Sequence, residues 1–223
     1  MDIKKVKLQT GKLRELKEFY LNTLGFKCFS ENDKSFTVIA GSSLLTFEQG
    51  NGNAFYHFAF NISENMIVQS LEWIQAKAEP MTYNGENIID FRSWDAHSIY
   101  FYDPAGNIIE FIARHRLENA SNGEFSFNNI TSISEIGMPV KNVEEFFKEI
   151  NEATGIPLFS GDNESFTAAG DDNGLLIIVP EGRNWFPNCP PAKIYPITLE
   201  LSGIKDSALA FGDYRYTIKS ISD

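Results

Sequence analysis

A tight hairpin at residues 100–112 is the feature of the sequence that most constrains the fold. An aromatic run leads into the turn Asp-Pro-Ala-Gly-Asn, in which Pro fixes φ, Gly takes a positive φ, and Asp and Asn bond to their own backbone. On the return strand, the period of two predicts that Glu110 shares one face with Ile108 and Ile112. A carboxylate among aliphatic side chains is costly unless it is paired, protonated or bound to a metal. Glu110 is therefore expected to have a partner.

The chain repeats itself at a nearly constant interval, which indicates two copies of one domain. We predict the first copy at residues 1–116 and the second at 127–223, joined by a polar linker at 117–126. Only 21 residues follow Ser202, so we expect the last module of the second copy to be truncated. The matched positions are Gly25, Ser30, Ser35, Phe36 and Thr37 with Gly155, Ser160, Ser165, Phe166 and Thr167, and then residues 55–63 with 194–202.

Each copy is predicted to run as strand, helix and three strands, followed by the same order again. The helix signals are Gly25 at a helix end, Ser63 as an N-cap, Asn142 with Glu145 as a capping box, and Gly155 at a helix end. Strands are expected to begin near Lys4, Phe36, Leu44, Tyr56, Ile88 and Ser98 in the first copy, and near Ser134, Phe166, Leu175 and Tyr195 in the second.

The hairpin, with its pattern Asp-Pro-x-Gly-Asn-x-x-Glu-aromatic, resembles the closing hairpin of the vicinal oxygen chelate superfamily. Glyoxalase I, the fosfomycin resistance enzymes, the extradiol dioxygenases and the bleomycin resistance proteins belong to this superfamily. The resemblance implies an α+β fold, in which tandem βαβββ modules form curled mixed sheets around a cleft. It also implies a divalent metal, such as Zn, Ni, Mn or Fe, held in many members by His and Glu side chains.

The resemblance makes His57 and Glu110 the candidate metal ligands, because they take the first-strand and last-strand positions of the second module. Lys5 stands where a metalloenzyme of this type has a His, and an ammonium group offers a metal no lone pair. Beside Glu110, Lys5 would instead form a buried ion pair. Zinc and related ions usually take at least three protein ligands. Glu48 is the candidate for the third, and its alternative is a solvated carboxylate at a strand end.

The second copy is expected to be a scaffold, a dimerisation half or a second apolar pocket. Glu135 takes its first-strand ligand position, Pro196 replaces His57, and the closing Glu is absent. A single carboxylate does not make a metal site. We therefore predict that the functional cleft lies in the first copy, and that changing Glu135 leaves ligand binding nearly untouched.

Several side chains of the first copy are candidates for contact with a ligand in the cleft. Tyr56, Phe91 and Trp94 supply an aromatic rim, and Lys5 supplies a charge. His97 is a candidate base or substrate contact, and its alternative is a loop residue that caps the hairpin.

Composition narrows the range of partners. The net charge of −11 and the pI near 4.8 argue against nucleic acid or an anionic membrane as a partner. The two cysteines do not indicate a disulfide framework, and no signal peptide or membrane-length apolar run is evident, so we expect a cytoplasmic protein. A small molecule is the expected partner, and a homodimer stays open as an arrangement.

Two functions follow from these observations. The first is a metal-free or weakly metal-binding module that resembles the bleomycin resistance proteins and holds a small organic molecule in the cleft of the first copy. The alternative is a divalent-metal-dependent lyase, isomerase or dioxygenase that acts on a small oxygenated substrate. Lys5 and the short last module favour the first function, whereas His57 and Glu110 favour the second.

Overall fold

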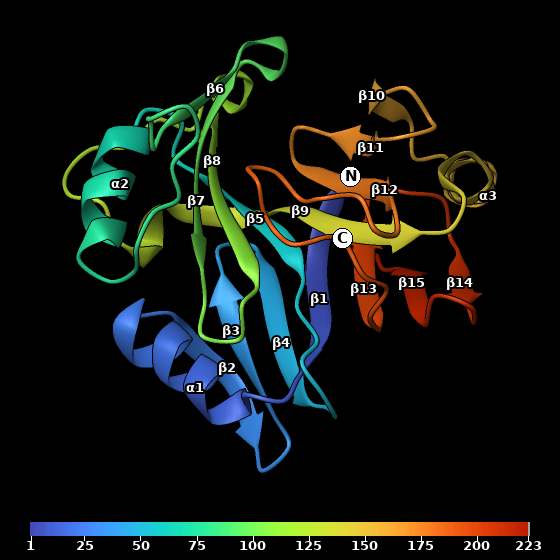
Figure 1. Ribbon diagram of the computed structural model, residues 1–223, viewed down its shortest axis with the longest axis horizontal. Coiled ribbons are helices and arrows are strands. Elements are labelled where there is room, and N and C mark those ends of the chain that lie inside the picture. The colour runs from blue at the N-terminus through green and yellow to red at the C-terminus, as the bar shows by residue number, and fades with distance from the viewer. Residues whose placement is uncertain (223) are drawn as a thin grey trace.

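The computed structural model describes residues 1–222 and folds them into four modules around one highly curved, branched sheet (Figure 1). The first module contains β1 (Asp2–Thr10), α1 (Leu13–Lys17), β2 (Lys27–Asn32), β3 (Ser35–Ala40) and β4 (Ser43–Gln49). The second contains β5 (His57–Ile62), α2 (Ile67–Gln75), β6 (Ile89–Phe91), β7 (Ala96–Tyr102) and β8 (Ile108–Arg114). The third contains β9 (Ile130–Val140), α3 (Val143–Thr154), β10 (Leu158–Gly161), β11 (Thr167–Asp171) and β12 (Gly174–Pro180). The fourth contains β13 (Ile197–Ser202), β14 (Ala208–Phe211) and β15 (Tyr216–Ser220).

The predicted order of strand, helix and three strands is confirmed in the first three modules, whereas the fourth module has no helix within the described residues. Most strands begin within two residues of the expected positions. Strand β9 begins earlier, at Ile130, and the strands β2, β10 and β14 were not predicted. All residues of β2 are exposed, so this strand carries no alternation of buried and exposed positions. It forms because its backbone pairs with the edge of β3.

The helix ends are mostly as expected. The first helix continues from α1 as a π-helical turn over Glu18–Thr23, and Gly25 follows it with a φ of 76°. The Asn142 side chain accepts a hydrogen bond from the Glu145 backbone N–H, and Gly155 ends α3 in the left-handed conformation. The expected N-cap at Ser63 is wrong, because α2 begins three residues later, after Met66. No helix within residues 1–222 is long and apolar enough to span a membrane.

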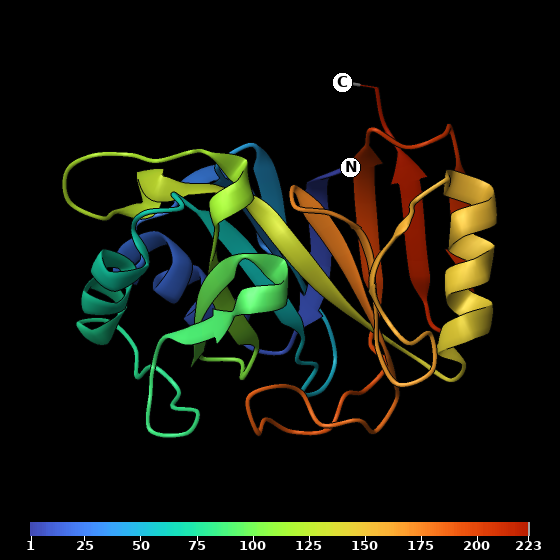
Figure 2. The same cartoon turned by 90° about the horizontal axis from the view of Figure 1, so that it is seen from above.

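The modules pair crosswise. Inside each module the first and last strands are parallel neighbours, as in β1 with β4 and β5 with β8. Between modules, β5 pairs antiparallel with β9, and β1 pairs antiparallel with β13. The second module is thus joined to the third, and the first to the fourth, while α2 and α3 lie at opposite ends of the molecule (Figure 2). Each of these seams joins strands from the two predicted sequence copies.

The closing hairpin fixes β8 beside β5. One oxygen of Asp103 accepts hydrogen bonds from the backbone N–H groups of Ala105 and Asn107, at 2.9 and 3.0 Å. The other accepts from the Asn107 amide at 2.7 Å and from the Tyr20 hydroxyl at 3.1 Å. The Asn107 side chain in turn accepts from the backbone N–H of Tyr56 at 2.8 Å. The turn therefore connects the first helix to the start of β5 and sets the register between β5 and β8.

The two faces of strands β5 and β8 have different environments. Phe58, Phe60, Ile109 and Phe111 belong to the main hydrophobic core, beneath the helices. The alternate residues of the same strands, including His57 and Glu110, point to the opposite face. The prediction that Ile108, Glu110 and Ile112 share a face is consistent with this arrangement, because the two isoleucines lie outside the main core in separate clusters.

We expect Asp103→Ala to lower the free energy of unfolding by about 2–4 kcal/mol, because it leaves several buried donors without an acceptor. Urea denaturation would measure the change. Asp33→Ala is a matched control, since Asp33 is an exposed aspartate in the turn between β2 and β3. A change of less than about 0.5 kcal/mol for Asp103→Ala would contradict the role given to this turn.

Candidate functional site

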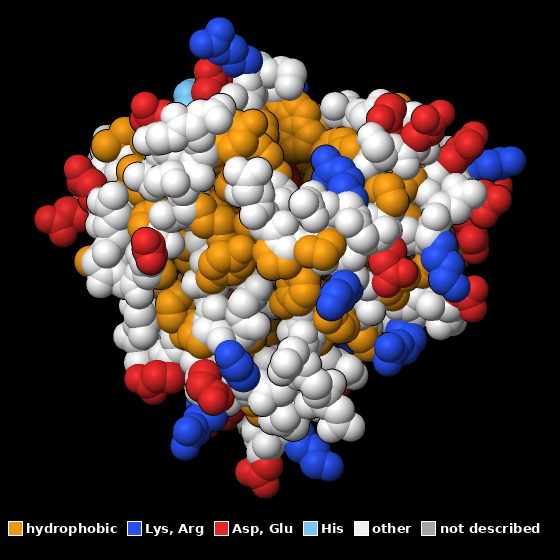
Figure 3. All heavy atoms as spheres, in the orientation of Figure 1, with side chains coloured by type: hydrophobic (Ala, Val, Ile, Leu, Met, Phe, Trp, Pro, Cys, Tyr) orange, Lys and Arg blue, Asp and Glu red, His pale blue; other side chains and the backbone are white. Residues whose placement is uncertain are grey.

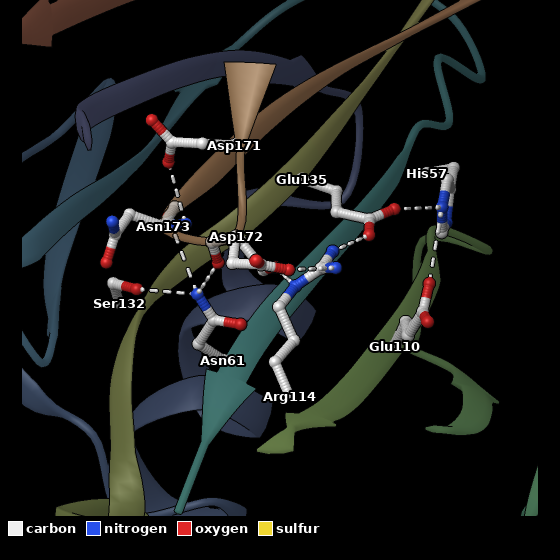
Figure 4. Close-up of polar contacts among 10 residues, drawn as sticks. His57, Asn61, Glu110, Arg114, Ser132, Glu135, Asp171, Asp172 and Asn173 are labelled. Carbon is white, nitrogen blue, oxygen red and sulfur yellow. Dashed lines mark hydrogen bonds and ion pairs between the residues drawn. The ribbon is translucent and has the colours of Figure 1, made fainter. Parts of the chain in front are cut away.

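Three buried side chains converge on the concave face of the seam between the second and third modules. They are His57 on β5, Glu110 on β8 and Glu135 on β9 (Figure 4). The Nε2 atom of His57 lies 3.6 Å from an oxygen of Glu110 and 3.9 Å from an oxygen of Glu135. One potential ligand atom from each residue lies within 4.8 Å of the other two. Within residues 1–222, this is the group of His, Cys, Asp and Glu side chains with the geometry to hold a metal ion.

Strand register explains why the three side chains meet. Ala59 of β5 has Glu110 as its neighbour on β8 and Glu135 as its neighbour on β9. The register between β5 and β9 then shifts by one residue, so that β9 bulges at Ser134 and Glu135. A bulge presents two successive side chains to nearly the same place. Both Ser134 and Glu135 consequently contact Arg114.

His57 has a defined tautomer. Its Nδ1 atom lies 3.2 Å from the backbone carbonyl of Ile108, and a carbonyl can only accept, so Nδ1–H is the donor. The lone pair is therefore on Nε2, which faces the two carboxylates. Burial lowers the pKa of His57 to about 4, so the ring is neutral near pH 7. A neutral ring whose far nitrogen is held by a carbonyl is the usual form of a metal-ligating histidine.

The two carboxylates have different environments. Burial raises the pKa of Glu110, and the nearby Glu135 carboxylate raises it further. Burial also raises the pKa of Glu135, but the Arg114 guanidinium opposes this shift. Arg114 is fully buried, donates to Glu135, and donates to the Ser134 hydroxyl at 3.1 Å. Glu135 is thus held by a cation, whereas Glu110 is the more basic carboxylate.

The donor set fits a divalent first-row metal ion. One imidazole nitrogen and two carboxylates supply the three protein ligands that catalytic metal sites commonly have. Two features of the group favour a cation: an uncommitted Nε2 lone pair, and a buried carboxylate whose charged form is disfavoured. In the third module, Ile177 on β12 takes the position that Glu110 takes on β8. Ile177 lies two residues beyond the β12 neighbour of Glu135, just as Glu110 lies two residues beyond the β8 neighbour of His57. Since Ile177 supplies no ligand atom, coordination positions would remain open toward the cleft.

A cavity of about 290 Å³ opens beside the three side chains. Hydrophobic side chains gather at the upper edge of the molecule between its two halves, with a basic side chain beside them (Figure 3). A mainly apolar cavity with a few convergent polar groups is the usual form of a small-molecule site. The lining residues are His57, Phe91, Trp94, Tyr100, Glu110, Glu135, Ser160, Phe166, Ile177, Arg183, Trp185 and Phe186.

Trp185 covers His57, and a glycine makes this contact possible. The indole lies 5.1 Å from the imidazole between ring centroids. A Cβ atom added to Gly137, two residues after Glu135 on β9, would lie 2.5 Å from the indole Cη2 atom and 3.2 Å from the His57 carbonyl. Gly137 therefore allows the Trp185 side chain to close one wall of the cavity.

The predicted site residues separate into two groups. His57 and Glu110 meet as expected, and Phe91 and Trp94 line the cavity. Tyr56, in contrast, donates its hydroxyl to the Pro196 carbonyl. His97 contacts His115, with 2.8 Å between Nδ1 and Nε2. Neither Tyr56 nor His97 is among the residues that line the cavity within the described part of the chain.

The expected ion pair between Lys5 and Glu110 is wrong. Lys5 lies on β1, which pairs with β4 and β13, and its ammonium group lies 3.7 Å from Glu200 at the other seam. Glu48, the candidate third ligand, is 3.5 Å from Lys7 and partly exposed. Glu135 is the third potential ligand, the role expected for Glu48, and it lies beside Glu110, where Lys5 was expected. We predicted Glu135 at a ligand position, but of the second copy.

No protein-family model matches the chain, and no curated protein matches it. Among solved structures, it is similar to a candidate dioxygenase from Bacillus subtilis subsp. subtilis strain 168, with a TM-score of 0.64 and 13% identity over 100% of this chain and 85% of that one. It is also similar to glyoxalase I from Zea mays, with a TM-score of 0.59 and 12% identity over 99% of this chain and 92% of that one. The chain thus has the same fold as these two structures, which confirms the predicted α+β fold class.

We expect Gly137→Ala to displace Trp185 and to lower the free energy of unfolding by about 1–3 kcal/mol, the usual effect of overpacking. Tryptophan fluorescence and urea denaturation would measure the two effects. Gly212→Ala is the control, because no atom lies within 4 Å of a Cβ added there. If Gly137→Ala left the emission spectrum and the stability as in the wild type, the proposed packing of Trp185 on β9 would be incorrect.

Proposed function

We propose that the protein is a divalent-metal-dependent enzyme that moves a proton on a small oxygenated substrate, as an isomerase or a lyase. The observation that carries the proposal is the presence of Glu135 beside His57 and Glu110. With His57 and Glu110 as the only two ligands, a metal-free binding protein was favoured. With Glu135 as the third ligand, a metal centre is favoured. The cavity beside these side chains provides space for a small substrate.

His57, Glu110 and Glu135 would hold the ion, which when bound acts as a Lewis acid toward neighbouring substrate oxygens. Arg114 holds Glu135 in place and favours its charged form. Of the two carboxylates, Glu110 is the one that Arg114 does not hold, so its carboxylate is free to turn toward a substrate proton, and we assign the proton transfer to it. The aromatic walls and Trp185 limit access of water to the reacting atoms.

The donor set favours proton transfer over oxygen chemistry. Non-haem Fe(II) oxygenases commonly use two histidines and one carboxylate. The group here has one histidine and two carboxylates. The dioxygenase alternative therefore has less support from these residues than the isomerase or lyase alternative, although a candidate dioxygenase is among the similar structures.

A metal-free binding protein is the second candidate, and one contact favours it. The ion pair between Arg114 and Glu135 already neutralises one of the two carboxylates without a metal. A proton on Glu110 would neutralise the other, in keeping with its raised pKa. Metal content separates the two candidates.

We expect protein purified without a histidine tag, and dialysed against Mn, Fe, Ni or Zn ions, to retain about one equivalent of at least one of them. Glu110→Gln and Glu135→Gln should each lower the affinity for that metal by more than about tenfold, because an amide is a weaker ligand than a carboxylate. Inductively coupled plasma mass spectrometry would measure the metal content. Gln keeps the side-chain size, so Glu110→Gln tests ligation with little change of packing. Glu135→Gln also removes the counter-ion of the buried Arg114, so its fold is checked by circular dichroism.

Glu48→Gln is the matched control, since Glu48 is a carboxylate of β4 that pairs with Lys7 and lies outside the group of His57, Glu110 and Glu135. It should retain the metal. Likewise, Lys5→His should not raise the affinity, because position 5 lies at the β1–β13 seam. Wild-type protein that holds none of the four metals, with all variants alike, would support the metal-free alternative and contradict the enzyme proposal.

A further inference from the structure

Arg183 lies at the cavity in a loop that holds its backbone firmly. Its N–H donates to the Pro180 carbonyl at 3.1 Å, and its carbonyl accepts from the Ala192 N–H at 2.8 Å. The side chain is half-buried, and the guanidinium carbon lies 5.5 Å from the centre of the Phe166 ring. Packing on an aromatic face orients the planar guanidinium and leaves its edge available for hydrogen bonds.

Arg183 has no acidic partner in the described part of the chain. The ion pairs that arginines form within residues 1–222 involve Arg92, Arg114 and Arg116. Arg14 and Arg215 form no ion pair within these residues either, but of the three only Arg183 lines the cavity. A half-buried cation that lines a cavity and has no internal counter-ion is suited to bind an anion from outside.

The other cation near the cavity is already bound. Arg114 is fully buried, and its guanidinium contacts Glu135 and Ser134. Arg114 packs on Trp94, and Arg183 packs on Phe166. The Trp94 and Phe166 rings contact each other, so aromatic rings lie between the two arginines. The cavity thus has three parts: a carboxylate-rich group, an aromatic middle and the Arg183 guanidinium.

We propose that Arg183 binds the carboxylate of a small aromatic or apolar acid, whose opposite end reaches His57, Glu110 and Glu135. This inference rests on the proposed function, because it takes the same cavity as the substrate site. Arg183 is the cavity-lining arginine that has no acidic partner within residues 1–222, so the acid group of a ligand is directed toward it. The guanidinium fork can donate two parallel hydrogen bonds to a carboxylate. The volume of about 290 Å³ suits one ring with a short chain.

The experiment compares 3-phenylpropionate with 3-phenylpropanol, which has nearly the same shape without the charge. Binding is followed by fluorescence, because Trp94 and Trp185 line the cavity. Wild-type protein should bind the acid at least about tenfold more tightly than the alcohol, the size expected for a charge-assisted pair. Arg183→Gln should remove this preference, and Arg183→Lys should restore part of it. Arg14→Gln, at an exposed arginine of α1, is the control and should behave as the wild type.

Three results would overturn the proposal. They are equal affinity for acid and alcohol in the wild type, an unchanged preference in Arg183→Gln, and no binding of either probe at millimolar concentration. Tighter binding of phenyl phosphate than of 3-phenylpropionate would show an anion site that is not a carboxylate site, and would overturn the assigned class.

The preference for the acid over the alcohol should persist after treatment with EDTA, since Arg183 and not a metal carries it. Metal content tests the proposed function separately, so that either claim can fail while the other stands.

Discussion

Strands β5 and β9 pair antiparallel, and this seam determines which polar side chains share a cleft. It joins the second module to the third and brings Glu135 within reach of His57. The closing hairpin sets the register of β8 against the other side of β5 through Asp103 and Asn107. The position of the candidate metal site is therefore a consequence of backbone pairing on both sides of one strand. The bulge at Ser134 and Glu135 then turns the last ligand toward the cavity.

Burial of several charges at this seam requires compensation. Two carboxylates and one guanidinium lie in a nearly water-free environment, where an unpaired charge is strongly unfavourable. Arg114 compensates Glu135, stacks on Trp94 at 5.4 Å, and lies 3.6 Å from Asp172. Glu110 has no cation of its own, and His57 is neutral. With both glutamates ionised, His57, Glu110, Glu135 and Arg114 together carry a net negative charge, which favours a bound cation.

Local pattern in the sequence predicted much of the fold and part of the site. The turn residues and the period of two located Glu110 on the inner face of a closing strand, and the resemblance added His57. The predictions that failed depended on which modules pair. Lys5 was expected beside Glu110, and Glu135 was assigned to a separate copy, because adjacent modules along the chain were taken as partners. Pairing of β5 with β9 and of β1 with β13 depends on the packing of the whole chain, and no short motif encodes it. Arg183 and Gly137 were missed because a loop and a strand interior give no signal at the level of sequence.

A crystal structure of the protein soaked with Mn²⁺, with anomalous diffraction data, tests the central claim most directly. We predict one strong anomalous peak within about 2.0–2.4 Å of the His57 Nε2 atom and of one oxygen each of Glu110 and Glu135. Arg114 should keep its contact with Glu135 through the other oxygen. A map without a peak at the β5–β9 seam, or with a peak held by other residues, would contradict the account.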